Sequence, residues 1–305
     1  MTIDLTGRVA MVTGGGRGLG RAHVRALAAR GAAVVINDLG VALDGTGKNP
    51  SPAEQLAEEI RQAGGRAVAD GSDIATEAGG AVAVQRAVNE FGRIDILVNN
   101  AGILRDRSAH KMSIADAEAV LRVHLLGAFC TTLPAFARMR AQGYGRIVQT
   151  TSASGLFGNF GQANYGAAKT GLTGLTKVIA IEGQDKNVYC NAISPCATTR
   201  MTEAGFGDMA RLFEPELVSP LVVYLTSETC RVTGEIFSVG GGQIARIFVG
   251  LTEGVFRKDR GLTPEEIDAS LEAIMDPTDF SIPKTLEDEW VKMLRQHGLE
   301  PAATK

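Results

Sequence analysis

The sequence predicts an α/β fold, a doubly wound parallel sheet with helices on both faces. Three observations support this prediction: short apolar, β-branched runs alternate with helical patterns, the first run ends in a glycine-rich turn, and the second ends in an acidic residue. The expected strands are 8–13, 33–37, 66–69, 94–98, 145–151, 188–193 and 235–239, with helices between them. In such a sheet, a ligand binds beyond the carboxyl ends of the strands.

The glycine-rich turn follows the first strand and reads TGGGRGLG at 13–20. A helical pattern over 22–30 comes next and stops at Gly31. Glycines let the backbone approach a pyrophosphate closely, and the N-terminus of the following helix favours its negative charge. This strand–turn–helix unit therefore predicts a Rossmann-like site for a dinucleotide.

The acidic residue that ends the second strand is Asp38, about 20 residues beyond the turn. A carboxylate at this place accepts hydrogen bonds from the adenosine ribose hydroxyls. It also repels a 2′-phosphate, which favours NAD over NADP as the cofactor. Arg17, within the turn, can pair with such a phosphate and is a weaker indication in the opposite direction.

A second pattern lies near the middle of the chain, where Tyr165 and Lys169 are four residues apart and Ser152 precedes them. Residues i and i+4 share a helix face, so we expect the ammonium to lower the pKa of the phenol from about 10. Such a phenol exchanges a proton with a substrate oxygen near neutral pH, and a serine hydroxyl can hold that oxygen. The pattern predicts interconversion of an alcohol and a ketone beside a bound hydride carrier.

Together with Asn-Asn-Ala-Gly at 99–102, these motifs resemble the short-chain dehydrogenase/reductase family over about residues 5–242. The resemblance implies catalysis by Ser152, Tyr165 and Lys169. It also implies that Asp73 and Ile74 flank the adenine, and that residues 195–199 touch the nicotinamide amide. The full set of implied cofactor contacts is Gly14, Arg17, Gly18, Leu19, Gly20, Asp38, Asp73, Ile74, Asn100, Ala101, Gly102, Tyr165, Lys169, Pro195, Ala197 and Thr198.

Longer segments resemble one branch of that family, the (3R)-hydroxyacyl-CoA dehydrogenase modules of multifunctional β-oxidation enzymes, which are also described as 17β-hydroxysteroid dehydrogenases. These segments are 34–40, 91–108, 122–129, 144–169 and 199–202. The resemblance implies NAD-dependent oxidation of a 3-hydroxyacyl-CoA by a homodimer, and it allows a steroid-derived acyl part in the substrate. The length of 305 residues leaves no room for the hydratase and sterol-carrier domains of the animal enzymes, so we expect a stand-alone relative.

Two positions depart from the family pattern. His124 stands where much of the family has an asparagine that helps to hold a proton-relay water, and Cys196 replaces the glycine of a Pro-Gly pair. A histidine can hold a water through either ring nitrogen. An equally good interpretation is a core histidine bonded to a backbone carbonyl.

Three other functions stay open at this point. The first is a steroid or secondary-alcohol dehydrogenase that needs no CoA. The second is an NADPH-dependent 3-oxoacyl carrier-protein reductase, against which Asp38 argues. The third is a non-catalytic NAD-binding sensor or scaffold, against which the intact Ser152, Tyr165 and Lys169 argue.

Composition limits the partners and the compartment. The net charge of −3 gives no electrostatic reason to expect nucleic acid or an anionic membrane. We expect no membrane span, because no stretch is long and apolar enough for one. We also expect no signal peptide, and the C-terminus is not a peroxisomal Ser-Lys-Leu signal. Cys130, Cys190, Cys196 and Cys230 have no metal-binding spacing, so we expect reduced thiols, no metal and a cytoplasmic protein.

Residues 243–305 lie beyond the expected domain of 1–242. Thr263-Pro264-Glu265-Glu266 begins one expected helix, and another is expected over 285–297. Such an extension is too small for a core of its own, so it should pack on the domain or on a dimer partner.

Two polar segments follow the second strand and the Asn-Asn-Ala-Gly motif. Residues 39–52 form an insertion after the second strand that is expected to be an exposed surface loop, and the family resemblance implies that it braces the adenine side of the site. Arg105, Arg107 and Lys111 can meet the phosphates of coenzyme A, but local ion pairing with Asp106 or Asp116 is the better interpretation.

Overall fold

A computed structural model describes residues 2–49, 51–199, 207–258 and 260–300. The chain divides into two compact units, Met1–Arg246 and Ile247–Lys305. The first unit carries the central sheet and every predicted site residue, so it comes first.

The central sheet has eight strands in the order β3-β2-β1-β4-β5-β6-β7-β8. Neighbouring strands from β3 to β7 are parallel, which confirms the predicted fold class. Chain order reverses between β1 and β4, and this switch point is where ligands bind in doubly wound sheets. The strands are β1 (Val9–Thr13), β2 (Ala33–Asn37), β3 (Arg66–Asp70), β4 (Ile96–Asn99), β5 (Gly145–Thr150), β6 (Val188–Pro195), β7 (Ile236–Gly240) and β8 (Gln243–Ile247).

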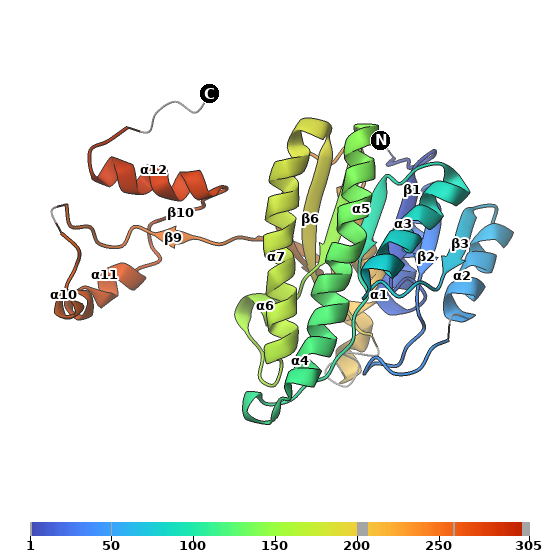
Figure 1. Cartoon of the computed structure of the whole chain (residues 1–305), viewed down its shortest axis with the longest axis horizontal. Coiled ribbons are helices and arrows are strands. Elements are labelled where there is room, and N and C mark those ends of the chain that lie inside the picture. Colours follow the sequence, from blue (N-terminus) through green and yellow to red (C-terminus); the bar gives the residue numbers. More distant parts are fainter. Residues whose placement is uncertain (1, 50, 200–206, 259, 301–305) are drawn as a thin grey trace. The chain divides into compact units, whose positions relative to one another are not determined.

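Helices cover both faces of this sheet, and Figure 1 shows α3, α5 and α7 together on one of them. Along β1, Val9 and Met11 pack into the cluster under α3, α5 and α7, whereas Ala10 and Val12 pack into the cluster under α1, α2 and α9. A strand that is buried on both faces has a continuous apolar sequence, which is why β1 could be predicted well from the sequence. The helices are α1 (Gly18–Ala28), α2 (Ser51–Gln62), α3 (Glu77–Phe91), α4 (Ile114–Leu121), α5 (Gly127–Gln142), α6 (Ala153–Phe157), α7 (Ala163–Gly183) and α9 (Ser219–Leu225), with short 3₁₀ helices η1 (Ala109–Lys111), η3 (Gln184–Lys186), η4 (Gly207–Phe213) and η5 (Pro215–Leu217).

The longest apolar helix runs from α4 to α5 through η2 (Arg122–Leu126), a π-helical turn. Residues 114–142 are long and apolar enough to span a bilayer, with a mean hydropathy of 1.4 in the most apolar window, so the expectation that no stretch qualifies was wrong. Ala135 and Met139 of α5 are fully buried against the sheet. Core helices of this kind pass the same test, so the finding is weak evidence for a membrane span.

The first unit extends past the expected boundary at Gly242. Only two residues connect β7 to β8, and so short a connection joins antiparallel strands. The sequence missed β8 because four of its five residues are exposed and give no apolar pattern.

The second unit contains more than the expected helices. Its strands β9 (Leu251–Thr252) and β10 (Phe280–Ser281) pair in antiparallel fashion. Thr263 and Thr285 each form a capping box, as the sequence predicts for Thr263. The expected first helix is interrupted at Ser270, between α10 (Pro264–Ala269) and α11 (Leu271–Met275), whereas α12 (Leu286–Gln296) is continuous.

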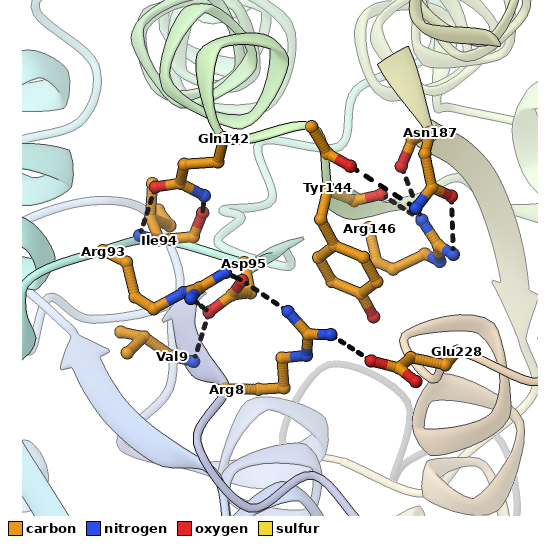
Figure 2. A network of polar contacts seen from close by, with 12 residues as sticks. Arg8, Val9, Arg93, Ile94, Asp95, Gln142, Tyr144, Arg146, Asn187 and Glu228 are labelled. Atoms are coloured by element: carbon orange, nitrogen blue, oxygen red, sulfur yellow. Dashed lines mark hydrogen bonds and ion pairs between the residues drawn. The ribbon is translucent and has the colours of Figure 1, made fainter. Parts of the chain in front are cut away.

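A network of charged side chains lies at the amino ends of β1, β4, β5 and β6 (Figure 2). The buried carboxylate of Asp95 accepts hydrogen bonds from the Val9 amide at 2.9 Å and from Arg93 at 2.6 Å. It also pairs with Arg8 at 3.1 Å. The guanidinium of Arg8 lies 3.7 Å from the centroid of the Tyr144 ring. The network therefore connects the amino ends of separate strands, and both oxygens of the buried Asp95 carboxylate have partners in it.

Candidate active site

A cleft of about 1220 Å³ lies at the carboxyl ends of the strands, at the switch point between β1 and β4. Most of the predicted site residues line it. These are Gly14, Arg17, Gly18, Leu19, Asp38, Asp73, Ile74, Asn100, Ala101, Gly102, Ser152, Tyr165, Lys169, Pro195 and Ala197. The fold therefore brings the glycine-rich turn and the Ser, Tyr and Lys side chains to one cavity.

The glycine-rich turn is shaped for close approach of a ligand. Gly14 has a φ of 63°, and a Cβ there would lie 2.8 Å from Ala101 Cα. A Cβ on Gly16 would lie 2.8 Å from Asp38 Oδ2. Larger side chains would fill this cradle, so the residues present fit the pyrophosphate and ribose of a dinucleotide cofactor.

Gly20 differs from the other predicted glycines because it does not line the cleft. A Cβ at this position would lie 2.0 Å from the Gly14 carbonyl oxygen. The absence of a side chain lets α1 pack closely on the turn, so Gly20 shapes the predicted cofactor site from behind.

Asp38 is held by the backbone around it. Its Oδ2 accepts from the Gly16 amide at 2.8 Å, and its Oδ1 accepts from the Gly40 amide at 2.7 Å. The carboxylate is half-buried and lines the cleft. Two amide donors fix its orientation, which suits an acceptor for ribose hydroxyls.

Asn100 connects the loop after β4 to the turn after β1. Its Nδ2 donates to the carbonyl oxygens of Thr13 and Gly14, both at 3.1 Å. Its backbone amide donates to the Thr13 hydroxyl at 3.0 Å. The side chain therefore holds the cradle in shape as well as lining it.

Lys169 is buried, and its Nζ donates to the Thr150 carbonyl oxygen at 2.6 Å. Burial lowers the pKa of this ammonium to about 7. The Nζ lies 5.5 Å from the centroid of the Tyr165 ring, so the two side chains meet on one helix face as predicted.

The sequence-based expectation that the pKa of Tyr165 is lowered was wrong for the protein without a bound cofactor. Burial raises the pKa of Tyr165 above its usual value, and hydrogen bonding with Ser152 opposes that rise. Ser152 is the N-cap of α6, where its Oγ accepts from the Ser154 amide at 3.2 Å. The lowering effect on the pKa of Tyr165 that the sequence assigned to Lys169 therefore comes from Ser152.

His124 lies in the π-helical turn η2, edge-on to the Tyr165 ring with centroids 5.1 Å apart. Its Nε2 contacts the backbone of Ile103, 3.0 Å from the amide nitrogen and 2.8 Å from the carbonyl oxygen. Burial lowers the pKa of His124 to about 3, so the ring is neutral. The backbone-bonded interpretation therefore holds for Nε2.

The other ring nitrogen of His124 is compatible with the interpretation in which this histidine holds a water. Nδ1 is buried without a partner among the described residues. A cavity of about 10 Å³, the size of a single water, is lined by both His124 and Lys169.

The loop after β6 divides into cleft-lining and structural residues. Pro195, Ala197 and Thr199 line the cleft. Thr198 does not line the cleft: its amide donates to the Phe213 carbonyl oxygen at 2.6 Å and its hydroxyl to that of Ala210 at 2.9 Å. The rest of the segment 199–202 lies outside the described residues.

Sequence reasoning expected the insertion 39–52 to brace the adenine side of the site but missed that its apolar residues form a wall of the cleft. Leu39, Val41, Ala42, Leu43 and Gly45 line it, although the insertion that contains them was expected to be an exposed loop. The available signal was the pair Val41 and Leu43 at alternate positions in an otherwise polar segment.

Arg105 takes part in local contacts, as the favoured interpretation predicts. Its Nε donates to the Asp44 carbonyl oxygen at 3.0 Å, and its guanidinium lies 3.9 Å from Asp116. Arg107 donates to the Asp106 carbonyl oxygen at 3.2 Å.

The family model described as short chain dehydrogenase matches residues 8–208. The chain therefore belongs to the short-chain dehydrogenase family and is an oxidoreductase, and enzymes of this family generally use nicotinamide cofactors. It is 47% identical over 307 residues to peroxisomal multifunctional enzyme type 2 of Mus musculus, covering 98% of this chain and 41% of that protein. The chain thus spans less than half the length of this relative.

Two further relatives match at close to full length. The chain is 39% identical over 287 residues to hydroxyacyl-CoA dehydrogenase ChsB1 of Mycobacterium tuberculosis, covering 88% of this chain and 89% of that protein. A crystal structure of a short chain dehydrogenase from Mycobacterium avium has a TM-score of 0.78 at 44% identity, covering 90% of this chain and 98% of that one. The predicted family is therefore confirmed by both sequence and fold.

Proposed function

We propose that the protein oxidises the 3-hydroxyl group of a 3-hydroxyacyl-CoA to a ketone with NAD. The observation that carries this proposal is the convergence of Ser152, Tyr165 and Lys169 on the cleft that Asp38 and the glycine-rich turn also line. The name of one relative, a hydroxyacyl-CoA dehydrogenase, supports the acyl-CoA substrate class.

The residues divide the chemistry in a simple way. A bound nicotinamide cofactor supplies the hydride acceptor. Tyr165, as phenolate, takes the proton from the substrate hydroxyl, and Ser152 donates a hydrogen bond to the same oxygen as the carbonyl forms. Lys169 places a cationic donor beside the phenol, 5.5 Å from its ring centroid, when it is protonated.

NAD is the proposed cofactor because Asp38, directly after β2, lines the cleft and is hydrogen-bonded to the glycine-rich turn. Both of its oxygens are held by backbone amides, so the carboxylate has little freedom to turn away from a 2′-phosphate. Repulsion between the two anions then disfavours NADP.

The test is NADH formation with (3R)- and (3S)-3-hydroxyacyl-CoA, each beside its CoA-free counterpart and each run in parallel with Tyr165→Phe. One short, one long and one steroid-derived acyl group cover the range of substrates. We expect turnover of the (3R) thioesters, dependent on Tyr165. Equal turnover of the free alcohols would instead assign a steroid or general alcohol dehydrogenase, and a strong NADPH preference in the reverse direction would assign a carrier-protein reductase.

We also propose that the protein is a homodimer formed through α5 and α7. Phe129 and Leu133 on α5, and Val178 and Ile181 on α7, are exposed apolar side chains on two helices that contact each other. Sedimentation velocity should give a dimer for the parent and a monomer for Leu133→Glu. Val82→Glu, at an exposed apolar position on α3, is the matched control and should stay dimeric.

Removal of residues 247–305 should weaken the dimer or raise the KM for long acyl chains.

A further inference from the structure

The insertion after β2 is a compact loop with a closed neck. The Asn49 amide donates to the Leu39 carbonyl oxygen at 3.2 Å, so the two ends of residues 39–49 meet. Gly40, with a φ of 69°, makes this possible, because a Cβ there would lie 1.6 Å from the Asn49 carbonyl oxygen. Ends that meet around a folded tip define an Ω-loop, and such loops are frequently functional.

The tip of this Ω-loop is docked on the loop that follows β4. The Leu104 amide donates to the Leu43 carbonyl oxygen at 2.8 Å, and Arg105 Nε donates to that of Asp44 at 3.0 Å. Gly45 lies against Ile103, since a Cβ on it would lie 3.1 Å from Ile103 Cδ1. Two backbone carbonyls and one apolar contact therefore hold the tip in place.

These two attachments set the path of the Ω-loop across the site. It starts directly after Asp38 at the end of β2 and docks beyond the end of β4. β2 and β4 are the two neighbours of β1 in the sheet, so the Ω-loop crosses the carboxyl end of β1, a span of about 10 Å. A dinucleotide binds across this same switch point.

The side of the Ω-loop that faces the cleft is apolar. Val41, Leu43 and Gly45 are half-buried and line the cleft together with Gly14 and Gly16, and the residues between them are exposed. Val41 also packs on the small apolar cluster that contains Ile103 and borders Tyr165. The Ω-loop is thus a wall that faces the cofactor cradle.

We propose that the Ω-loop of residues 39–49 is a clasp over the adenosine half of the cofactor. Val41 and Leu43 contact this half, and the docked tip must separate from Ile103–Arg105 before the dinucleotide leaves. The clasp rests on the nicotinamide cofactor of the proposed function and is independent of the acyl substrate.

The test compares two variants with a control from the same loop. Gly45→Val combines a φ of 88° with the short distance to Ile103, so it should detach the tip. Leu43→Ala keeps the carbonyl that Leu104 binds and removes the apolar wall. Lys48→Ala changes an exposed residue that does not line the cleft. Thermal unfolding verifies that each protein is folded.

The readout is the NADH dissociation rate constant from stopped-flow fluorescence, with the affinity for ADP-ribose measured by competition. We expect NADH to leave about tenfold faster from Gly45→Val and a few-fold faster from Leu43→Ala, with ADP-ribose weakened in proportion and Lys48→Ala unchanged. Dissociation rates within twofold of the parent in both variants would overturn the clasp. A raised KM for the acyl substrate with unchanged NADH dissociation would assign the wall to the substrate and overturn it as well. The NADH dissociation rate constant and the affinity for ADP-ribose can both be measured without turnover. A failure of the acyl-CoA proposal would therefore be distinguishable from a failure of the clasp.

Discussion

The amino ends and the carboxyl ends of the central strands, called here the amino edge and the carboxyl edge of the sheet, differ in how their buried polar groups are paired. At the amino edge, the buried carboxylate of Asp95 is paired with Arg8, Arg93 and the Val9 amide (Figure 2). At the carboxyl edge, His124 Nδ1 and Thr150 Oγ1 are buried without a partner among the described residues. The first edge is satisfied within the protein, whereas the second retains capacity to bind something else.

The difference has an energetic meaning. A buried polar atom without a partner costs about 1–3 kcal/mol, so a folded protein seldom keeps one without a reason. The buried carboxylate at the amino edge is paired on both of its oxygens within the protein, so its contacts stabilise the fold. We expect substitutions at the two edges to separate cleanly into effects on stability and effects on activity.

The largest expected effect is at the carboxyl edge. Tyr165→Phe removes the phenolic oxygen and keeps the ring that packs against His124. General acid–base catalysis is lost, so kcat should fall about a thousandfold. The unfolding midpoint and the NADH affinity should stay at the parent values. A residual kcat within tenfold of the parent would move the base to another residue.

The next effect belongs to the amino edge. Asp95→Ala leaves the Val9 amide buried without its acceptor and removes the partner of Arg8 and Arg93. Breaking a buried pair of this kind should lower the free energy of unfolding by about 3 kcal/mol, measured by urea denaturation. Asp185→Ala, which breaks the exposed pair with Arg140, is the control and should change little. Equal losses from the two substitutions would contradict the structural role of the network.

A third effect is a pH dependence that comes from Lys169. Its pKa is about 7 in the folded protein and about 10.4 in the unfolded chain, so between these values the unfolded state binds one more proton. Stability should therefore rise with pH from about 7 to about 10.4, by up to about 1.4 kcal/mol per pH unit. Lys169→Met should lack this rise, as measured by denaturation of the cofactor-free protein at pH 7, 8 and 9. Parallel curves for parent and variant would contradict the lowered pKa.

The smallest effect concerns cofactor choice. Asp38→Ala removes the carboxylate that repels a 2′-phosphate, so the ratio of kcat/KM for NAD to that for NADP should fall about tenfold, equal to about 1.4 kcal/mol. Asp44→Ala, an acidic residue on the neighbouring loop, should leave the ratio unchanged. A ratio that does not move in Asp38→Ala would remove the argument for NAD.

Much of the first unit follows from sequence because its strands are buried on both faces. The run 33–37 predicts β2 to the residue, and the other predicted strands agree with the structure to within two residues at each end. β8 and the break at Ser270 were not predicted, since exposed strands and short helices lack a clear apolar period.

The side chains of the candidate site were predicted for a different reason. Ser152, Tyr165, Lys169 and Asp38 belong to motifs with fixed spacing, and all four line the cleft. The insertion was expected to brace the adenine side, but the docking of its tip was not predicted, because it depends on backbone groups of Leu43 and Asp44 that meet a loop some 60 residues away. The pKa of Tyr165 was misjudged because burial, which raises it, depends on the tertiary fold.

The most direct test of the division between the edges is a double-mutant cycle of Tyr165→Phe and Asp95→Ala. β5 alone, with six residues, separates the edges by about 20 Å, a distance at which effects normally add. For each protein, kcat/KM and the free energy of unfolding would be measured under one set of conditions. The account predicts that both quantities are additive to within about 0.5 kcal/mol. A coupling energy above about 1 kcal/mol in either quantity would show that the two edges are energetically linked, and would contradict the division drawn here.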